Sequence, residues 1–319
     1  MTAGAVLGVD IGTSSSKGLL VGMDGQILAT AFREHQPDRP LPGRVEMDAD
    51  LWWQEFRQIS RDVLSSFSGR LAAVGVSGMG PCVLVSDEDN KPLRPAILYG
   101  IDTRALQEIH DLTEELGGDG PILSRCGSTL STQAAGPKLR WIARHEPEIA
   151  AQARRLFMPS SWLVHQLTGS YVLDHHSASQ CTPMYDTDAH AWYLPWAARV
   201  APGMDLPELM WPGDIAGRVT QAASAATGIP AGTPVITGTI DAWSEAISVD
   251  GHNSGDLMLM YGTTMFLINT VESRVSAPAM WGTVGALKGT RNLAGGMATS
   301  GAITGWLKDL FGSPDYSEL

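Results

Sequence analysis

A segment near the N-terminus, residues 8–18, places the tightest limits on the fold and reads Gly-Val-Asp-Ile-Gly-Thr-Ser-Ser-Ser-Lys-Gly. Apolar runs precede and follow it, and a third apolar run, residues 26–31, comes after Asp24-Gly25. Short apolar runs separated by glycine-containing turns are typical of strands joined by tight turns. The sequence therefore predicts three consecutive strands at the start of the chain.

The first of these turns has the composition of an anion-binding site. Its small residues let backbone N–H groups close around an anion, and its hydroxyl and lysine side chains add donors. The residues concerned are Gly12, Thr13, Ser14, Ser15 and Lys17. Asp10 ends the first strand and would face a bound phosphate, which is favourable only if a cation or its water shell lies between them. The alternative is a plain hairpin with a polar tip.

Two better-known phosphate-binding motifs do not fit this segment. A P-loop requires Gly-Lys-Ser/Thr, whereas Lys17 here precedes Gly18. The dinucleotide-binding fingerprint requires a helix after the glycines, whereas a second strand is predicted here.

Composition limits the class of protein. The 319 residues are enough for two domains, and a net charge of −12 leaves no basic stripe for a nucleic-acid partner. The three cysteines, Cys82, Cys126 and Cys181, are too far apart for a disulfide framework, which favours a reducing, cytoplasmic location. We found neither a signal peptide nor an apolar run long enough to span a membrane.

A second informative segment contains residues 234–249. It is predicted to form a strand, a turn at residues 238–240 and a helix that begins with Asp241. An acidic residue at a helix start is commonly an N-cap. A strand-to-helix turn is also a place from which an aspartate can point into a cleft as a general base.

The opening arrangement of strand, polar turn and strand occurs again near the end of the chain. Residues 256–261 and 265–270 are predicted strands, and Gly262, Thr263 and Thr264 lie between them. Two such hairpins could hold a phosphate chain from both sides. Residues 293–300 are predicted as a glycine-rich turn, and the helix that starts at Gly301 offers a third phosphate contact at its N-terminus.

Asp174-His175-His176 suggests a metal site only weakly. Adjacent histidines point in different directions, and no third ligand has a diagnostic spacing.

Taken together, these segments resemble the FGGY family of carbohydrate kinases. The resemblance also extends to residues 45–48 with Trp52-Trp53, and to the segments 75–78, 102–104, 136–141, 167–169 and 232–235. It implies the α/β actin/Hsp70/sugar-kinase fold, which is ribonuclease H-like, in two domains. Residues 1–249 would form the sugar-binding domain, and residues 250–319 the beginning of an incomplete nucleotide-binding domain.

The resemblance implies that ATP, with Mg²⁺, phosphorylates a sugar hydroxyl. Asp241 matches the catalytic base, which its helix N-terminus should keep ionised. Asp10 matches the residue that holds Mg²⁺ through water. The phosphate contacts match Thr13, Ser14 and Lys17 in the first turn and Thr263 and Thr264 in the second, and Gly301 matches a glycine near the nucleotide. The implied partners are a small sugar and ATP, with no nucleic acid or membrane, and a homodimer is left open.

The expected substrate is a ketopentose such as D-xylulose. Met79-Gly80-Pro81 stands where glycerol kinases have Arg-Glu and well-known xylulokinases Met-His, and residues 99–104 look xylulokinase-like. Met79, Gly80 and Asp241 are the expected substrate contacts, with Gln133 in place of an aromatic residue that some members use. Ala242 replaces an amide-bearing residue.

Family members extend well beyond residue 311. The resemblance therefore implies a piece of a longer kinase, with an exposed sheet edge and little or no kinase activity by itself. The competing interpretations are a sugar-binding or regulatory protein of the same fold without catalysis, and a kinase that acts on another sugar or polyol. A chaperone-like member and a helix-turn-helix repressor are both disfavoured.

Overall fold

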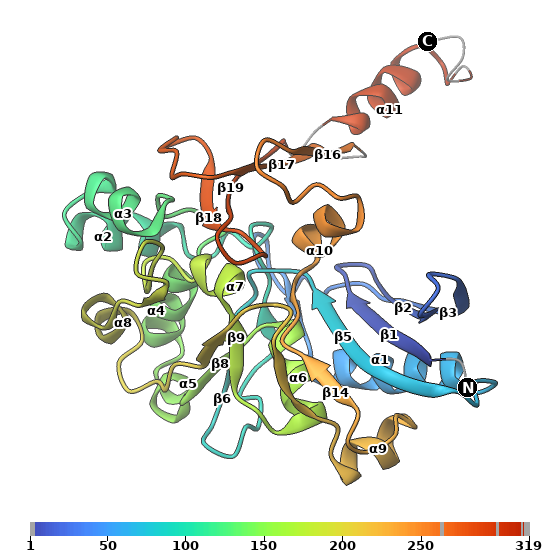
Figure 1. Ribbon diagram of the computed structural model, residues 1–319. Helices are drawn as coiled ribbons and strands as arrows, with labels where there is room; N and C mark the ends of the chain where they lie inside the picture. The colour runs from blue at the N-terminus through green and yellow to red at the C-terminus, as the bar shows by residue number, and fades with distance from the viewer. Residues whose placement is uncertain (1–3, 262–264, 298–299, 314, 316–319) are drawn as a thin grey trace.

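The computed structural model of the chain describes residues 4–261, 265–297, 300–313 and 315. Its centre is a seven-stranded sheet that begins with the three consecutive antiparallel strands predicted from the sequence (Figure 1). The strands are β1 (Gly4–Ile11), β2 (Ser15–Gly22), β3 (Ile27–Glu34), β5 (Arg70–Gly78), β13 (Ile215–Arg218), β14 (Pro234–Ile236) and β15 (Thr239–Ile240). The order is β13-β14-β5-β1-β2-β3, and β15 also pairs with β5. Because β1, β14 and β15 all run parallel to β5, their carboxyl ends lie at one edge of the sheet.

Three helices pack together with this sheet, namely α1 (Ala49–Leu64), α6 (Pro159–Thr168) and α9 (Gln221–Thr227). The Asp48 side chain caps α1 by accepting a hydrogen bond from the amide of Asp50. The apolar residues that recur along α1, including Trp52 and Phe56, are fully buried. Helix and sheet are in close contact, because a Cβ at Gly18 of β2 would lie 2.1 Å from the Ile59 side chain.

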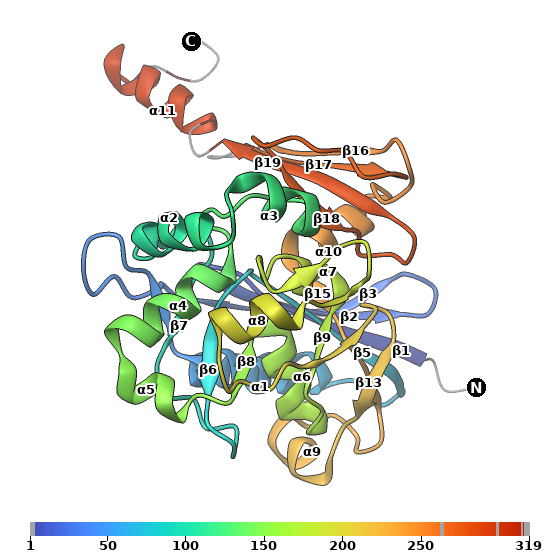
Figure 2. The ribbon, with the colours of Figure 1, turned by 90° about the vertical axis from the view of Figure 1, so that its left-hand side faces the viewer.

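The next part of the chain is mainly helical and lies on the side of the molecule away from β1–β3 (Figures 1 and 2). Its helices are α2 (Leu106–Glu115), α3 (Asp119–Cys126), α4 (Ala135–His145), α5 (Pro147–Gln152), α7 (His175–Ser179) and α8 (Leu194–Val200). Short strand pairs connect them: β4 (Glu46–Met47) with β7 (Ala96–Ile97), β6 (Leu84–Ser86) with β8 (Arg155–Phe157), β9 (Val172–Asp174) with β12 (Glu208–Met210), and β10 (Tyr185–Asp186) with β11 (Ala191–Trp192).

After α10 (Asp241–Ser248), the chain forms a four-stranded antiparallel sheet of order β16-β17-β19-β18. Its strands are β16 (Leu257–Tyr261), β17 (Met265–Val271), β18 (Trp281–Val284) and β19 (Arg291–Met297), and α11 (Gly301–Leu310) follows. Trp243 of α10 and Ile268 and Val284 of this sheet belong to the same buried core as the helical part. The sheet therefore packs against the helical part. The expected exposed edge is β16, where Leu257 and Leu259 are 56% and 57% exposed.

The prediction of a glycine-rich turn at residues 293–300 is wrong, because most of that segment is β19. Gly295 and Gly296 pair with Leu267 and Phe266 of β17. A Cβ at Gly296 would lie 3.3 Å from the Phe266 ring, so glycine here makes room for a neighbouring side chain within a strand.

No helix in the described part of the chain has the length and apolar content needed to cross a membrane.

Candidate active site

The carboxyl ends of three parallel strands bring the main candidate residues together. Asp10 of β1 is paired in register with Ser77 of β5, and Ser77 is paired in turn with Thr239 of β15. Asp241 follows β15 and is the first residue of α10. Open α/β sheets bind their ligands outside the carboxyl ends of parallel strands. The register therefore places Asp10 and Asp241, far apart in the sequence, at the same edge of the sheet.

A glycine fixes the path of the chain into Asp241. Gly238 has a φ of +72°, and a Cβ on it would lie 2.1 Å from the Val76 carbonyl oxygen. Only glycine lets the backbone approach β5 so closely in this conformation. Gly238 thus allows β15 to dock against β5 and sets where α10 begins.

Asp10 is held by a hydrogen bond and faces a lysine. The Ser77 hydroxyl donates to Asp10 Oδ1 at 2.7 Å, and Lys17 lies directly across from Asp10 on β2. Burial raises the pKa of Asp10, and the Ser77 hydrogen bond and the Lys17 charge partly offset that rise. A nearby cation would therefore stabilise the ionised form of Asp10.

Asp241 differs from the expectation that it stays fully ionised. Its pKa is raised to about 7, chiefly by burial and additionally by the negative charges of Asp10 and Glu245, while the hydrogen bond from the Ala242 amide opposes the rise. The helix N-terminus is therefore outweighed by desolvation and by two neighbouring carboxylates. A carboxyl group with a pKa near 7 can both take up and release a proton at neutral pH.

Glu245 is an acidic residue at this site that the sequence did not single out. It lies one turn after Asp241 on α10, and its own pKa is raised by burial and by the Asp10 charge and lowered by Lys17. The spacing of four residues places the side chains of Asp241 and Glu245 on one face of the helix. This spacing is the feature of the sequence from which Glu245 could have been predicted as a site residue.

This arrangement fits a magnesium ion held mainly through water. Asp10, Asp241 and Glu245 influence one another's charge, yet no three His, Cys, Asp or Glu side chains among the described residues are close enough to bind an ion directly. Mg²⁺ usually keeps several waters and binds through one or two carboxylates plus substrate phosphates. Asp10 remains the residue we expect to hold it.

The raised pKa of Asp241 gives a prediction about stability in metal-free buffer. The folded protein binds the Asp241 proton more tightly than the unfolded chain, whose ordinary pKa is 3.8. The contribution of Asp241 to the free energy of unfolding therefore decreases as the pH rises from about 4 through about 7. We expect Asp241→Asn to have a higher Tm than wild type at about pH 8, with a difference that shrinks toward about pH 4 in thermal unfolding scans. A constant or inverted difference would contradict the assignment.

The tip of the first hairpin is closed by a hydrogen bond from the Gly12 amide to the Ser15 carbonyl at 2.9 Å. The Thr13 hydroxyl lies 2.8 Å from the Tyr99 hydroxyl, and Ser14 is exposed. The second hairpin has its predicted strands β16 and β17, but Gly262, Thr263 and Thr264 lie outside the described residues. Gly301 begins α11, which extends away from the rest of the molecule in Figure 1. Its contact with a nucleotide remains a prediction.

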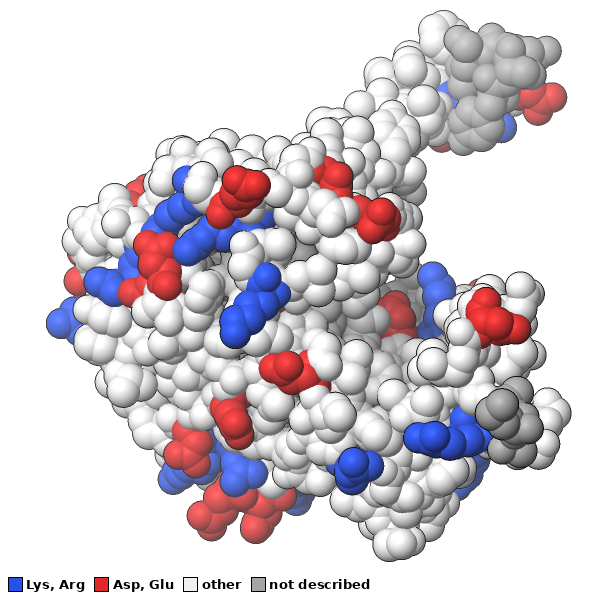
Figure 3. Space-filling model, viewed as in Figure 1, with Lys and Arg blue, Asp and Glu red and all other residues white. Residues whose placement is uncertain are grey.

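A hollow separates the part carrying β16–β19 from the lobe of β1–β3, and both acidic and basic side chains face it (Figure 3). Asp10 and Lys17 belong to the β1–β3 lobe, and Asp241 belongs to the helix that leads into the upper part. The candidate residues therefore come from both parts of the chain that border this hollow.

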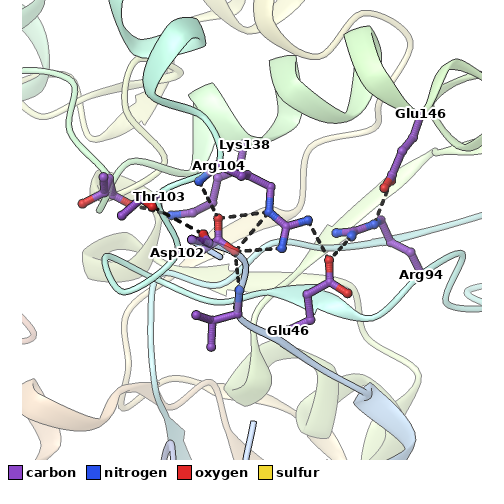
Figure 4. Close-up of polar contacts among 10 residues, drawn as sticks. Glu46, Arg94, Asp102, Thr103, Arg104, Lys138 and Glu146 are labelled. Atoms are coloured by element: carbon purple, nitrogen blue, oxygen red, sulfur yellow. Dashed lines mark hydrogen bonds and ion pairs between the residues drawn. The ribbon is translucent and has the colours of Figure 1, made fainter. Parts of the chain in front are cut away.

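Tyr99 comes from a segment that is anchored by buried ion pairs. Arg104 pairs with Asp102 at 2.7 Å and with Glu46 at 2.6 Å, and Glu46 also binds Arg94 at 2.5 Å (Figure 4). Asp102 in turn donates its amide to the Tyr99 carbonyl. Helix α2 begins at Leu106, directly after this network. The network holds Tyr99 against Thr13.

The expected substrate contacts lie around the same segment. Gln133 Oε1 accepts a hydrogen bond from the Gly100 amide at 2.8 Å. Gly80 lies against Ile240, and a Cβ on it would be 2.7 Å from that side chain. Met79 is only 1% exposed and packs in the core beside the sheet. Contact of these residues with a sugar remains a prediction.

The two adjacent histidines have structural roles. His176 is buried, with Nδ1 2.7 Å from the Val284 carbonyl oxygen, and burial lowers its pKa to about 3. His175 contacts the Tyr185 hydroxyl at 2.8 Å. Asp174 caps α7 and accepts a hydrogen bond from Thr239 at 2.8 Å. These side chains fix β18 and β15 in place.

Comparison with known proteins agrees with this geometry. The model of the FGGY family of carbohydrate kinases, N-terminal domain, matches residues 5–248. A glycerol kinase of Nocardia farcinica is 32% identical over 330 residues, covering 96% of this chain and 63% of that protein. A xylulose kinase of Streptomyces rubiginosus is 30% identical over 290 residues, covering 90% of this chain and 58% of that protein.

The solved structures extend the match to three dimensions. The crystal structure of xylulose kinase from Rhodospirillum rubrum has a TM-score of 0.92 and 28% identity, and it covers 98% of this chain and 64% of that one. The chain thus has the sugar-kinase, actin-like α/β fold and spans less than two thirds of the length of these relatives. It belongs to the FGGY family of carbohydrate kinases.

Proposed function

We propose that the protein transfers the γ-phosphate of ATP to a hydroxyl group of a ketopentose of the D-xylulose type. The observation that carries this proposal is the position of Asp241, at the ends of parallel strands that also present Asp10 and the first phosphate hairpin. A pKa of about 7 suits Asp241 to accept the proton of the attacking hydroxyl.

Phosphoryl transfer needs mainly positioning and charge neutralisation. The turn of the first hairpin, residues 12–15, would bind the phosphate chain. The positive charge of Lys17 would face the negative charge of the phosphates. Asp10 would hold Mg²⁺, which neutralises charge on the transferring phosphoryl group when it is bound. Asp241 would orient the sugar hydroxyl and take its proton.

The choice of a ketopentose rests on the residues at the sugar side. Met79-Gly80 lacks the Arg-Glu pair of glycerol kinases, although relatives bearing both names match the chain. We place the boundary between the sugar-binding and nucleotide-binding domains near residue 249, at the end of α10. The described cysteines are free, which supports a reducing, cytoplasmic location.

A coupled ATP-turnover screen of the full-length gene product with Mg²⁺ tests this proposal. The panel should contain ketopentoses, aldoses, glycerol and other polyols. We expect turnover with a ketopentose and the highest kcat/KM for D-xylulose. Preference for a polyol would overturn the substrate class, and sugar binding without turnover would favour a regulatory protein instead.

The 319-residue chain itself is expected to bind the sugar but to turn over ATP little or not at all. It contains the strand ends that carry Asp10 and Asp241, while the relatives are longer. Calorimetric sugar titration and the same coupled assay check both statements. Turnover by this chain at the rate of the full-length product would contradict the second.

A further inference from the structure

A buried histidine and carboxylate lie directly behind the tip of the first hairpin. His35 Nε2 is 3.0 Å from the Gly12 carbonyl oxygen, and its Nδ1 is 3.0 Å from Glu55 Oε2. The Ser16 hydroxyl donates to the same Glu55 oxygen at 2.6 Å. The side chains of His35 and Glu55 are only 4% and 7% exposed. Neither residue belongs to the motifs that the sequence brought forward.

The contact with Gly12 determines that Nε2 of His35 carries a proton. A carbonyl oxygen only accepts hydrogen bonds, so Nε2 must donate to Gly12. The Glu55 carboxyl group lies against the other ring nitrogen, Nδ1, and is itself held by the Ser16 hydroxyl. Glu55 therefore fixes the orientation of the His35 ring.

The bond to Gly12 also sets the direction of the next amide. In a trans peptide unit the C=O and the following N–H point in opposite directions. Because the Gly12 carbonyl points back to His35, the Thr13 N–H points away from it. The Thr13 amide makes no hydrogen bond with another described residue. The His35 amide binds the Ser14 carbonyl at 3.0 Å, so a second carbonyl of the tip is also held from behind.

We propose that His35, oriented by Glu55, is a positioning residue that aims the Thr13 N–H at the phosphate chain of the nucleotide. This inference rests on the proposed function, since it assigns the first hairpin to phosphate. It adds a residue outside the hairpin, directly after the end of β3, that determines how well the hairpin binds phosphate. The sugar side of the site is not involved.

Two substitutions at His35 separate its two contacts. The glutamine amide nitrogen occupies the place of Nε2, so His35→Gln keeps the donor to Gly12. The asparagine amide nitrogen occupies the place of Nδ1, so His35→Asn keeps the donor to Glu55 and loses the contact with Gly12. In the full-length product we expect His35→Asn to raise KM for ATP about tenfold, the effect expected when a buried carbonyl loses its hydrogen-bond donor. KM for the sugar should be unchanged.

His35→Gln should recover most of the ATP affinity, and His110→Asn, at a side chain 65% exposed on α2, serves as the matched control. Equal effects of the two His35 variants, or a change in sugar KM alone, would overturn the inference. If the wild-type protein phosphorylates no sugar, the proposed function fails. The affinity of each variant for ATP with Mg²⁺ can still be compared by titration, so the inference about His35 remains testable.

A spectroscopic measurement covers the case in which the variants do not fold. Heteronuclear NMR of the imidazole nitrogens in the wild-type protein should show a proton on Nε2 of His35, the nitrogen that faces the Gly12 carbonyl oxygen. A ring without a proton on Nε2 would overturn the inference without any variant.

Discussion

Asp241→Asn is expected to lower kcat for sugar phosphorylation by about 10²–10⁴-fold, the range for loss of a general base. Asparagine has nearly the same shape and can still accept the Ala242 amide, as Asp241 Oδ1 does at 2.8 Å. Sugar affinity should therefore change little. Steady-state kinetics of the full-length product, with sugar binding measured by calorimetry, separate the two effects.

Glu245→Gln provides the matched control, because it removes a carboxylate one turn away on the same helix. Glu245 is exposed and acts on Asp241 only through its charge. We expect a change in kcat of less than about tenfold, since a partly solvated charge contributes little. A loss of activity in Glu245→Gln equal to that in Asp241→Asn would contradict the assignment of the base.

Gly238→Ala is expected to lower the free energy of unfolding by about 3 kcal/mol or more. The new methyl group would lie 2.1 Å from the Val76 carbonyl, in a backbone conformation that alanine adopts poorly. Relief requires β15 to move away from β5, and this also displaces Asp241. Denaturant unfolding would give the stability change, and kcat should fall with it.

Gly232→Ala distinguishes the clash from backbone strain. Gly232 also has a positive φ, +83°, but no heavy atom lies within 4 Å of a Cβ built on it. We expect a cost of about 1 kcal/mol and unchanged kinetics. Similar stability losses in the two variants would show that close approach to β5 does not govern the position of Asp241.

The local parts of the site could be predicted from the sequence. The first hairpin follows from apolar runs interrupted by glycine, and the strand-turn-helix at Asp241 follows from a change of hydrophobic period. Both predictions depend only on residues that are close to one another in the sequence. The same logic predicted β16 and β17 but misread β19, because glycine usually marks a turn, whereas Gly296 here makes room for Phe266 within a strand.

The parts that depend on distant neighbours could not be predicted. Ser77 bonds Asp10 only because β5 lies beside β1, and Tyr99 reaches Thr13 only because buried ion pairs anchor its segment. The ionisation of Asp241 was misjudged for the same reason. The helix N-terminus is visible in the sequence, whereas burial and the Asp10 charge depend on the fold.

The most direct test of the central claim is to follow the γ-phosphate of ATP by phosphorus NMR. The full-length product would be given Mg²⁺ with equal concentrations of D-xylulose and glycerol. The account predicts a ketopentose phosphate as the main product with wild type, and an initial rate of its formation lowered about a hundredfold or more with Asp241→Asn. Glycerol phosphate as the main product, or an undiminished rate with the variant, would contradict it.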